Sequence, residues 1–244
     1  MAHPRILSWL PLVALAGACV ENNADSGMVI LKNIAPDDGC AVSPESTTFR
    51  GSGTIQADSR AGYLFTPLVR NDLATIEGEN TTAKTIFVTG AKVTISFYDA
   101  ELFTAAEQTQ FQTDGLTRFL VPTSGTIDPD GGQSTFHLEI VPPELLTAIR
   151  GKLTAAASHT GLDVSVQMQG TRSGGSLASN TFHYPVTVCL DCAVQVVGAC
   201  ASLPSGGTYR SGGACNPVQD GVVDCCTDTA GALVCPAVPA TPPQ

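Results

Sequence analysis

Alternating apolar and polar side chains dominate the pattern of this chain, and they predict β-strands. In three segments every second residue is apolar, which would place one face of each strand against a core and the other in solvent. The most regular segment alternates Leu162, Val164 and Val166 with Asp163 and Ser165. The three segments are 92–98, 135–140 and 162–169, and less regular strands are expected at 49–56, 63–69, 117–121 and 182–188.

One segment has the spacing of a helix instead. Pro142 and Pro143 are suited to the first turn, because a helix leaves its first backbone N–H groups unpaired and proline has none to lose. Leu145, Ile149 and Leu153 then recur four residues apart, which places them on one face. We therefore expect an amphipathic helix that begins at these prolines.

Between the expected strands and this helix, the sequence predicts turns and a second, weaker helical segment. Clusters of turn-forming residues at 123–125 and 128–132 separate the strands. A second short helix is expected at 101–112, although it contains Thr104 and shows few capping residues. About seven or eight short strands with short connections predict an antiparallel, immunoglobulin-like β-sandwich over 28–188, with one or two short helices.

The composition changes at Cys189, where glycine, proline and cysteine replace most large apolar residues. Chain entropy of about 1–2 kcal/mol per residue would exceed what so little apolar burial can offset. Disulfides would have to stabilise this part instead. We expect a small Cys-rich module at 189–235, followed by a Pro-rich tail at 236–244.

The number of cysteines allows four disulfide bridges. The chain has nine cysteines, and setting Cys19 aside for the reason given below leaves eight. Seven of these lie in the module, so if all pair, one of them must reach Cys40. Cys189 and Cys192 are the preferred partners because they close the last strand of the body. The eight residues are Cys40, Cys189, Cys192, Cys200, Cys215, Cys225, Cys226 and Cys235.

The adjacent Cys225 and Cys226 should bond different partners, because a bridge between neighbouring cysteines closes a strained ring. With Cys215 and Cys235 they resemble small secreted disulfide frameworks, some of which inhibit proteases or act as toxins. The segment 182–192 together with the double cysteine is similar to predicted lipoproteins of myxobacterial type. That resemblance implies placement in the cell envelope and no particular activity.

The N-terminus has the form of an export signal. Arg5 precedes an apolar run at 6–15, and small residues at 16–18 lead to Cys19. The run is too short to span a bilayer, which takes about 20 apolar residues. The small residues and the cysteine resemble the lipobox of bacterial lipoproteins, with Ala16 where that family usually has leucine.

This resemblance implies that residues 1–18 are removed and that Cys19 carries diacylglycerol and an acyl chain such as palmitate. Residues 19–27 would then form a polar tether. Val20 in place of an acidic residue implies sorting to the outer membrane. The alternative is an ordinary secretory signal cut after Ala18, which would leave Cys19 unmodified.

The net charge and the aromatic content limit the classes of binding partner that we expect. The formal net charge is −10, which would repel a phosphate backbone, so nucleic acid is not expected as a partner. The single tryptophan, Trp9, lies in the signal. Exposed tryptophan is a common sugar-binding platform, so its loss disfavours a sugar-binding module but leaves it open.

Cys189 and Cys192 have the spacing of a redox or zinc motif. Asp191 would disfavour a thiolate, and zinc would need a second ligand pair nearby that the sequence lacks. A structural disulfide is the better interpretation.

No other motif predicts catalysis. His137, His159 and His183 are scattered, and neither a His-Glu-x-x-His nor a Gly-x-Ser-x-Gly motif is present. Asp128 and Asp130 lack the closing glutamate of a calcium loop, which favours a plain hairpin. We predict no catalytic residue, no metal and no cofactor.

The sequence therefore favours a non-enzymatic, membrane-anchored lipoprotein that binds a partner or organises the envelope. Its partners would be membrane lipid, through Cys19, and an envelope protein or extracellular ligand. One alternative is an extracytoplasmic hydrolase whose site draws on His137 or His183 with scattered Asp and Ser residues, which clustering of those groups in one cleft would favour. The other is an inhibitor or toxin-like module in the tail, which a rigid exposed loop between bridges would favour.

Overall fold

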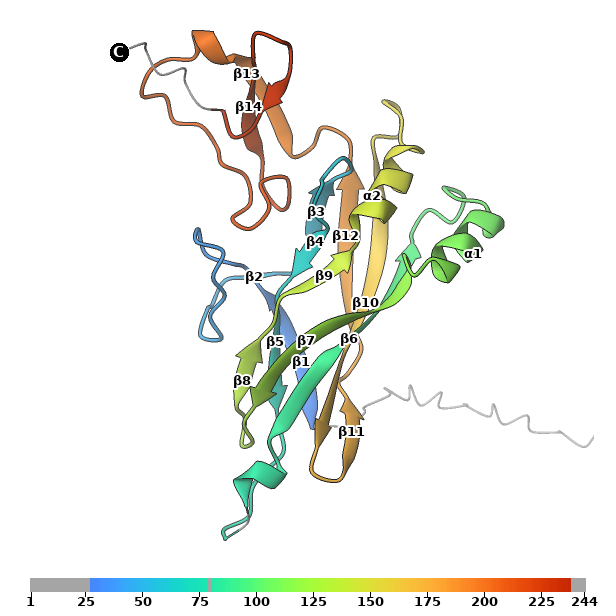
Figure 1. Ribbon diagram of the computed structural model, residues 1–244, viewed down its shortest axis with the longest axis vertical. Helices are drawn as coiled ribbons and strands as arrows, with labels where there is room; N and C mark the ends of the chain where they lie inside the picture. Colours follow the sequence, from blue (N-terminus) through green and yellow to red (C-terminus); the bar gives the residue numbers. More distant parts are fainter. Residues whose placement is uncertain (1–26, 79, 238–244) are drawn as a thin grey trace, which may run out of the picture.

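The computed structural model describes residues 27–237 with the exception of residue 79 (Figure 1). The expected signal, Cys19, most of the tether and residues 238–244 lie outside the described residues. The described part is mainly β, and its strands form a two-sheet sandwich followed by a disulfide-rich tail. The predicted fold class is confirmed.

The first sheet is built from two long, interrupted strands and two partners. The chain from Tyr63 to Asn71 runs beside the chain from Gln133 to Val141, and each is divided in two by a short irregularity. The order of strands is β2-β1-β5-β8, and β4 and β9 pair beyond the irregularity. Their bounds are β1 (Met28–Ile34), β2 (Phe49–Arg50), β4 (Tyr63–Phe65), β5 (Pro67–Asn71), β8 (Gln133–Thr135) and β9 (Leu138–Val141).

The second sheet has the order β3-β12-β10-β6-β7, with β11 paired to one end of β10. All of its pairs are antiparallel except β3 with β12, which is parallel. The bounds are β3 (Gly53–Gln56), β6 (Ile86–Phe97), β7 (Arg118–Ile127), β10 (His159–Arg172), β11 (Gly175–Ala178) and β12 (Phe182–Cys189).

The segment 49–56, expected as one strand, passes from one sheet to the other. β2 pairs with β1 in the first sheet, and β3 pairs with β12 in the second. Gly51 and Ser52 make the crossing between them. Because both pieces have extended backbone and similar composition, the sequence pattern does not reveal that they belong to different sheets.

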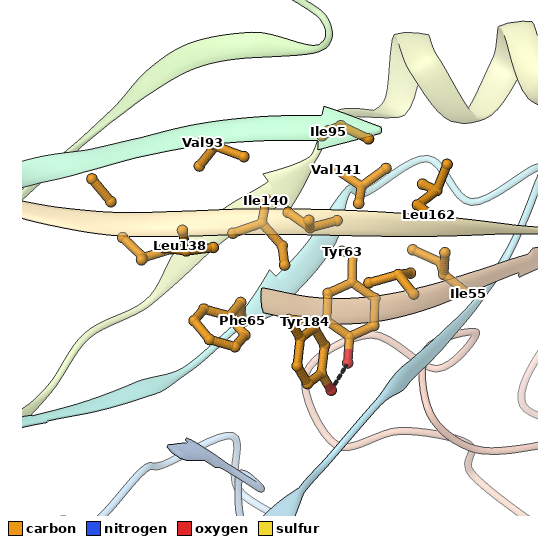
Figure 2. Close-up of a cluster of buried hydrophobic side chains, with 14 of the residues drawn as sticks. Ile55, Tyr63, Phe65, Val93, Ile95, Leu138, Ile140, Val141, Leu162 and Tyr184 are labelled. Carbon is orange, nitrogen blue, oxygen red and sulfur yellow. Dashed lines mark hydrogen bonds between the residues drawn. The ribbon is translucent and has the colours of Figure 1, made fainter. Parts of the chain in front are cut away.

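The core lies between the sheets and follows the predicted alternation. Leu162, Val164, Val166 and Met168 are all 0% exposed. Side chains from both sheets meet them, and Figure 2 shows Phe65, Ile140 and Tyr184 among the residues that fill this space. The expected strands at 92–98, 117–121, 162–169 and 182–188 are confirmed, although the first ends at Phe97 and the second continues to Ile127.

Helix α2 (Pro143–Arg150) confirms the predicted amphipathic helix, with Leu145, Leu146 and Ile149 buried. Its chain then turns away, so Leu153 joins the core from beyond the helix. Short 3₁₀ turns occur at η1 (Thr81–Ala83) and η2 (Cys200–Ser202).

Helix α1 (Ala105–Thr113) corrects the expectation of few caps. Thr104 is its N-cap, and Glu107 completes a capping box by accepting a hydrogen bond from the Thr104 backbone. The spacing Thr104-x-x-Glu107 is the signal that could have located this helix start. The cluster at 123–125 is a second correction: it lies inside β7 and not in a turn. The turn expected at 128–132 is present.

The tail sheet has the order β13-β14-β15 and lies beyond one end of the sandwich (Figure 1). Cys225 and Cys226 bond different partners, as expected from their adjacency. The bridges are Cys40–Cys215, Cys189–Cys192, Cys200–Cys226 and Cys225–Cys235. The strands are β13 (Val194–Ala199), β14 (Val223–Thr227) and β15 (Leu233–Val234).

Cys40 does bond a tail cysteine, but the preference for Cys189 or Cys192 was wrong. Those two bond each other across the turn that ends β12, so neither is left for Cys40. The segment that begins at Cys215 instead returns along β3, where the Gln56 N–H donates to the Val218 carbonyl at 3.1 Å. This return brings Cys215 to Cys40, with 4.8 Å between their Cα atoms.

Candidate functional site

The solvent-facing side of the second sheet carries an ordered array of polar side chains. It arises from the strand alternation, because every residue that enters the core sends its neighbours outward. We call this surface the outer face. It comprises Lys92, Thr94, Ser96, Tyr98, Arg118, Leu120, Gly161, Asp163, Ser165, Gln167, His183, Pro185 and Thr187.

Strand register arranges the outer face in rows across the sheet, about 7 Å apart along the strands. The Tyr98 N–H donates to the Gly161 carbonyl at 3.0 Å, and Gly161 pairs with Thr187. The other rows follow from the paired residues in the same way. They are Ser96-Asp163-Pro185, Arg118-Thr94-Ser165-His183 and Leu120-Lys92-Gln167.

Tyr98 places an aromatic ring on the first row. Its side chain is 64% exposed, yet its ring covers Gly161, where an added Cβ would overlap ring carbons. Glycine is required for this contact, since any side chain on the facing residue would displace the ring. An aromatic residue that covers a cross-strand glycine also protects the strand backbone.

Beside these rows lies a hollow of about 560 Å³, between α1 and the ends of β6 and β7. One face of α1 lines it with Ala105, Gln108, Thr109 and Gln112, because these positions repeat with the helical period. The strands contribute Thr94, Ile95, Ser96, Phe97, Thr117 and Arg118, and Ala100 completes the lining. Three of these residues also belong to the outer face, so the hollow and the rows form one continuous surface.

Arg118 is the only charged residue that lines the hollow. It makes no ion pair within the described ranges, and neither does Lys92, its diagonal neighbour on the outer face. Asp163 is the one carboxylate on this surface, and it lies against His183. Two unpaired cations therefore stand on one face of a chain whose net charge is −10.

The structure brings together Asp163, Ser165 and His183, the set on which a hydrolase could draw. Asp163 Oδ2 lies 2.9 Å from His183 Nδ1, and Ser165 Oγ lies 3.2 Å from the same nitrogen. In a Ser-His-Asp triad the serine contacts Nε2 while the carboxylate holds Nδ1. Here both groups share Nδ1, so the imidazole is not placed to take the Ser165 proton while Asp163 orients it.

The other histidines do not join this cluster. His137 is exposed between β8 and β9 in the first sheet, and His159 is exposed at the start of β10. Neither imidazole makes a hydrogen bond or an ion pair within 27–78 and 80–237. The hypothesis that His137 contributes to a site with scattered Asp and Ser residues finds no cluster there.

The acidic turn has a structural use of its own. Asp130 Oδ1 accepts a hydrogen bond from the Thr75 N–H at 2.7 Å, which holds a loop against the hairpin. The Thr75 hydroxyl also donates to this carboxylate, and the hydrogen bonds from the Thr75 hydroxyl and N–H lower the pKa of Asp130. Across the described chain, no group of three or more His, Cys, Asp or Glu side chains is arranged to hold a metal ion. Within the same residues, no helix has both the length and the apolar character needed to cross a membrane.

Comparison with known proteins gives no family. No protein-family model matches the chain, and no curated protein matches it. A solved structure described as "Crystal structure of protein from Archaeoglobus fulgidus" has a TM-score of 0.33 and 13% identity, over 54% of this chain and 87% of that one. A likeness at this level carries no argument about fold family or function.

Proposed function

We propose that this protein is a lipid-anchored, non-enzymatic binding module of the outer membrane that engages an envelope or extracellular ligand through its outer face. Cys19 would supply the anchor and residues 19–27 the tether. The observation that carries the proposal is the continuity between the polar rows of the second sheet and the hollow beside α1. Binding surfaces of this kind combine a concavity with a few placed polar groups.

The geometry of the His183 cluster favours binding over hydrolysis. A general base must reach the proton that it abstracts, and Nδ1 already lies against Asp163 at 2.9 Å. The His183 side chain is 63% exposed, so burial does not isolate it from water. On this surface the imidazole serves better as a hydrogen-bonding group for a ligand.

Anchoring and binding need separate tests. For anchoring, Cys19→Ser should release the protein from the membrane fraction. The mass of the variant should also lack the increment that lipid adds to the parent protein. Unchanged membrane retention and an unchanged mass relative to the parent protein would refute the anchor.

For binding, a photoreactive amino acid in place of Ser96 should crosslink an envelope component in living cells. Ser96 is exposed, and it lies both on the outer face and at the hollow. The matched control replaces Thr82, an exposed residue of η1 far from the outer face. Equal crosslinking from the two positions, or none from Ser96, would contradict the proposal.

A second candidate function rests on the hairpin of β14 and β15. Between Cys226 and Cys235 the chain turns at 228–232, where the Asp228 carboxylate accepts hydrogen bonds from the backbone N–H groups of Ala230 and Ala232. This is a braced, exposed loop between bridges, the feature that would suit an inhibitor or toxin-like module. Incubation with a panel of proteases, with residual protease activity as the readout, would test it.

A further inference from the structure

We propose, building on the binding function above, that the ligand of the outer face is a polysaccharide that carries carboxylates. One sugar ring would stack on Tyr98, and a carboxylate farther along the chain would be held by Arg118 and Lys92. The neutral polar side chains between them would hydrogen-bond the sugar hydroxyls.

Tyr98 offers the apolar contact that a sugar ring needs. A sugar presents C–H groups on its faces, and an exposed aromatic ring is the usual surface that covers them. The ring of Tyr98 is backed by Gly161 on one side and 64% exposed. It therefore provides a supported platform at the end of the rows, in a mature chain without tryptophan.

Charge complementarity points to an acidic ligand of low charge density. Arg118 and Lys92 are diagonal neighbours without an acidic partner, so a carboxylate could bind both. Arginine suits this contact because its planar fork pairs with two carboxylate oxygens. A nucleic acid would need many more cations to neutralise its phosphates than this acidic chain presents.

The space between the platform and the cations is lined by hydroxyl and amide groups. Ser96 and Thr94 lie on the rows, and Gln112 faces the hollow. Such groups both donate and accept hydrogen bonds, which matches sugar hydroxyls that do the same. The Asp163 carboxylate adds an acceptor next to Ser96.

The test uses oligomers of polygalacturonate as the probe, titrated against the folded protein by calorimetry. Their methyl esters, which keep the sugar rings and lose the charge, are the first control. Polyglutamate, which keeps the carboxylates and lacks sugar rings, is the second. The proposal expects polygalacturonate to bind at least about tenfold more tightly than either control.

Four variants assign the contacts. Arg118→Gln and Lys92→Gln should each weaken polygalacturonate binding by about tenfold and leave binding of the methyl ester unchanged. Tyr98→Ala should weaken binding of both sugars, and Gly161→Ala should do the same while Tyr98 remains present, because it displaces the ring. Arg60→Gln removes an exposed cation outside the outer face and is the matched control.

Three results would overturn the proposal: no binding of polygalacturonate, equal binding of polyglutamate, or an equal effect of Arg60→Gln and Arg118→Gln. These results leave the broader binding function separately testable through crosslinking at Ser96. If crosslinking from Ser96 persists while polygalacturonate fails, the ligand class is wrong and the binding surface stands. If both fail, the proposed function fails with it.

Discussion

The Tyr63 hydroxyl donates a hydrogen bond of 2.7 Å to the Asp220 carboxylate, and this bond joins the sandwich to its tail. Tyr63 is fully buried at the start of β4, and its hydroxyl also meets that of Tyr184 at 2.9 Å (Figure 2). The Asp220 carboxylate accepts a second hydrogen bond from the Thr54 N–H and forms an ion pair with Arg50. Burial and the neighbouring carboxylate raise the pKa of Tyr63, so its proton stays in place to make the bond.

Tyr63→Phe should therefore destabilise the protein by about 1–3 kcal/mol, because it leaves a buried carboxylate and the Tyr184 hydroxyl without one partner. Urea unfolding would measure this loss. The matched control is Tyr209→Phe, since the Tyr209 hydroxyl is buried without a partner in the described structure and its removal should be neutral or stabilising. Equal losses for the two variants would show that the Asp220 contact contributes nothing.

Gly53→Ala should cost about 1–3 kcal/mol, because an added Cβ would overlap the Tyr63 ring and force the two strands apart. Gly51, two residues earlier, has no atom within 4 Å of an added Cβ. Gly51→Ala should therefore change stability by no more than about 0.5 kcal/mol. Thermal unfolding of both variants would measure the difference, and a similar cost at both positions would contradict the packing described here.

Loss of the Cys40–Cys215 bridge should destabilise the protein more than loss of Cys225–Cys235. The first closes a loop with a sequence separation of 175 and the second one of 10. In the chain-entropy model these loops correspond to about 5 and about 3 kcal/mol. Paired Cys→Ser variants under denaturant titration would test the order, and the reverse order would refute the entropic account.

Acidification should loosen helix α1 through Glu107. Hydrogen bonds from the Lys152 side chain and the Thr104 backbone lower the pKa of Glu107 from its ordinary 4.5 to about 2. Because the pKa of Glu107 is lowered in the folded state, the stabilisation that its ionised carboxylate gives to the folded protein is fully present above pH 4.5. This stabilisation is lost as the pH falls toward 2. NMR titration of the α1 amides should show the change, and Glu107→Gln should abolish it.

Glu144→Gln is the control for this titration. Glu144 lies in the first turn of α2, and its carboxylate makes no hydrogen bond or ion pair with another described residue. The variant should leave the response of α1 to pH intact. A titration of α1 that disappears in this variant would place the responsible carboxylate elsewhere.

The alternating segments were sufficient to predict the sandwich because strand period and burial coincide. Val164 and Val166 are buried where the pattern placed them, and α2 follows its leucine spacing. The crossing of 49–56 between sheets and the choice of Cys215 over Cys189 depend on tertiary pairing. Neither leaves a local signal in the sequence.

The candidate site was less predictable than the fold. His183 stood out in the sequence, but its partners Asp163 and Ser165 come from a different strand, and only the β10–β12 register joins them. Tyr98 lies over Gly161 for the same reason. Side chains that face solvent are under weak packing constraint. The alternating pattern therefore predicts that these side chains are exposed, but it does not predict which of them are neighbours on the surface.

Hydroxyl-radical footprinting tests the outer face most directly, because it reports the exposure of individual side chains with and without ligand. Tyr98 and Leu120 are 64% and 70% exposed on the outer face, whereas Ile76 and Leu233 are 72% and 51% exposed elsewhere. With polygalacturonate or a captured envelope ligand bound, modification of Tyr98 and Leu120 should fall severalfold while Ile76 and Leu233 stay unchanged. Protection of Leu233 with Tyr98 and Leu120 unchanged would contradict the account and place binding on the tail hairpin.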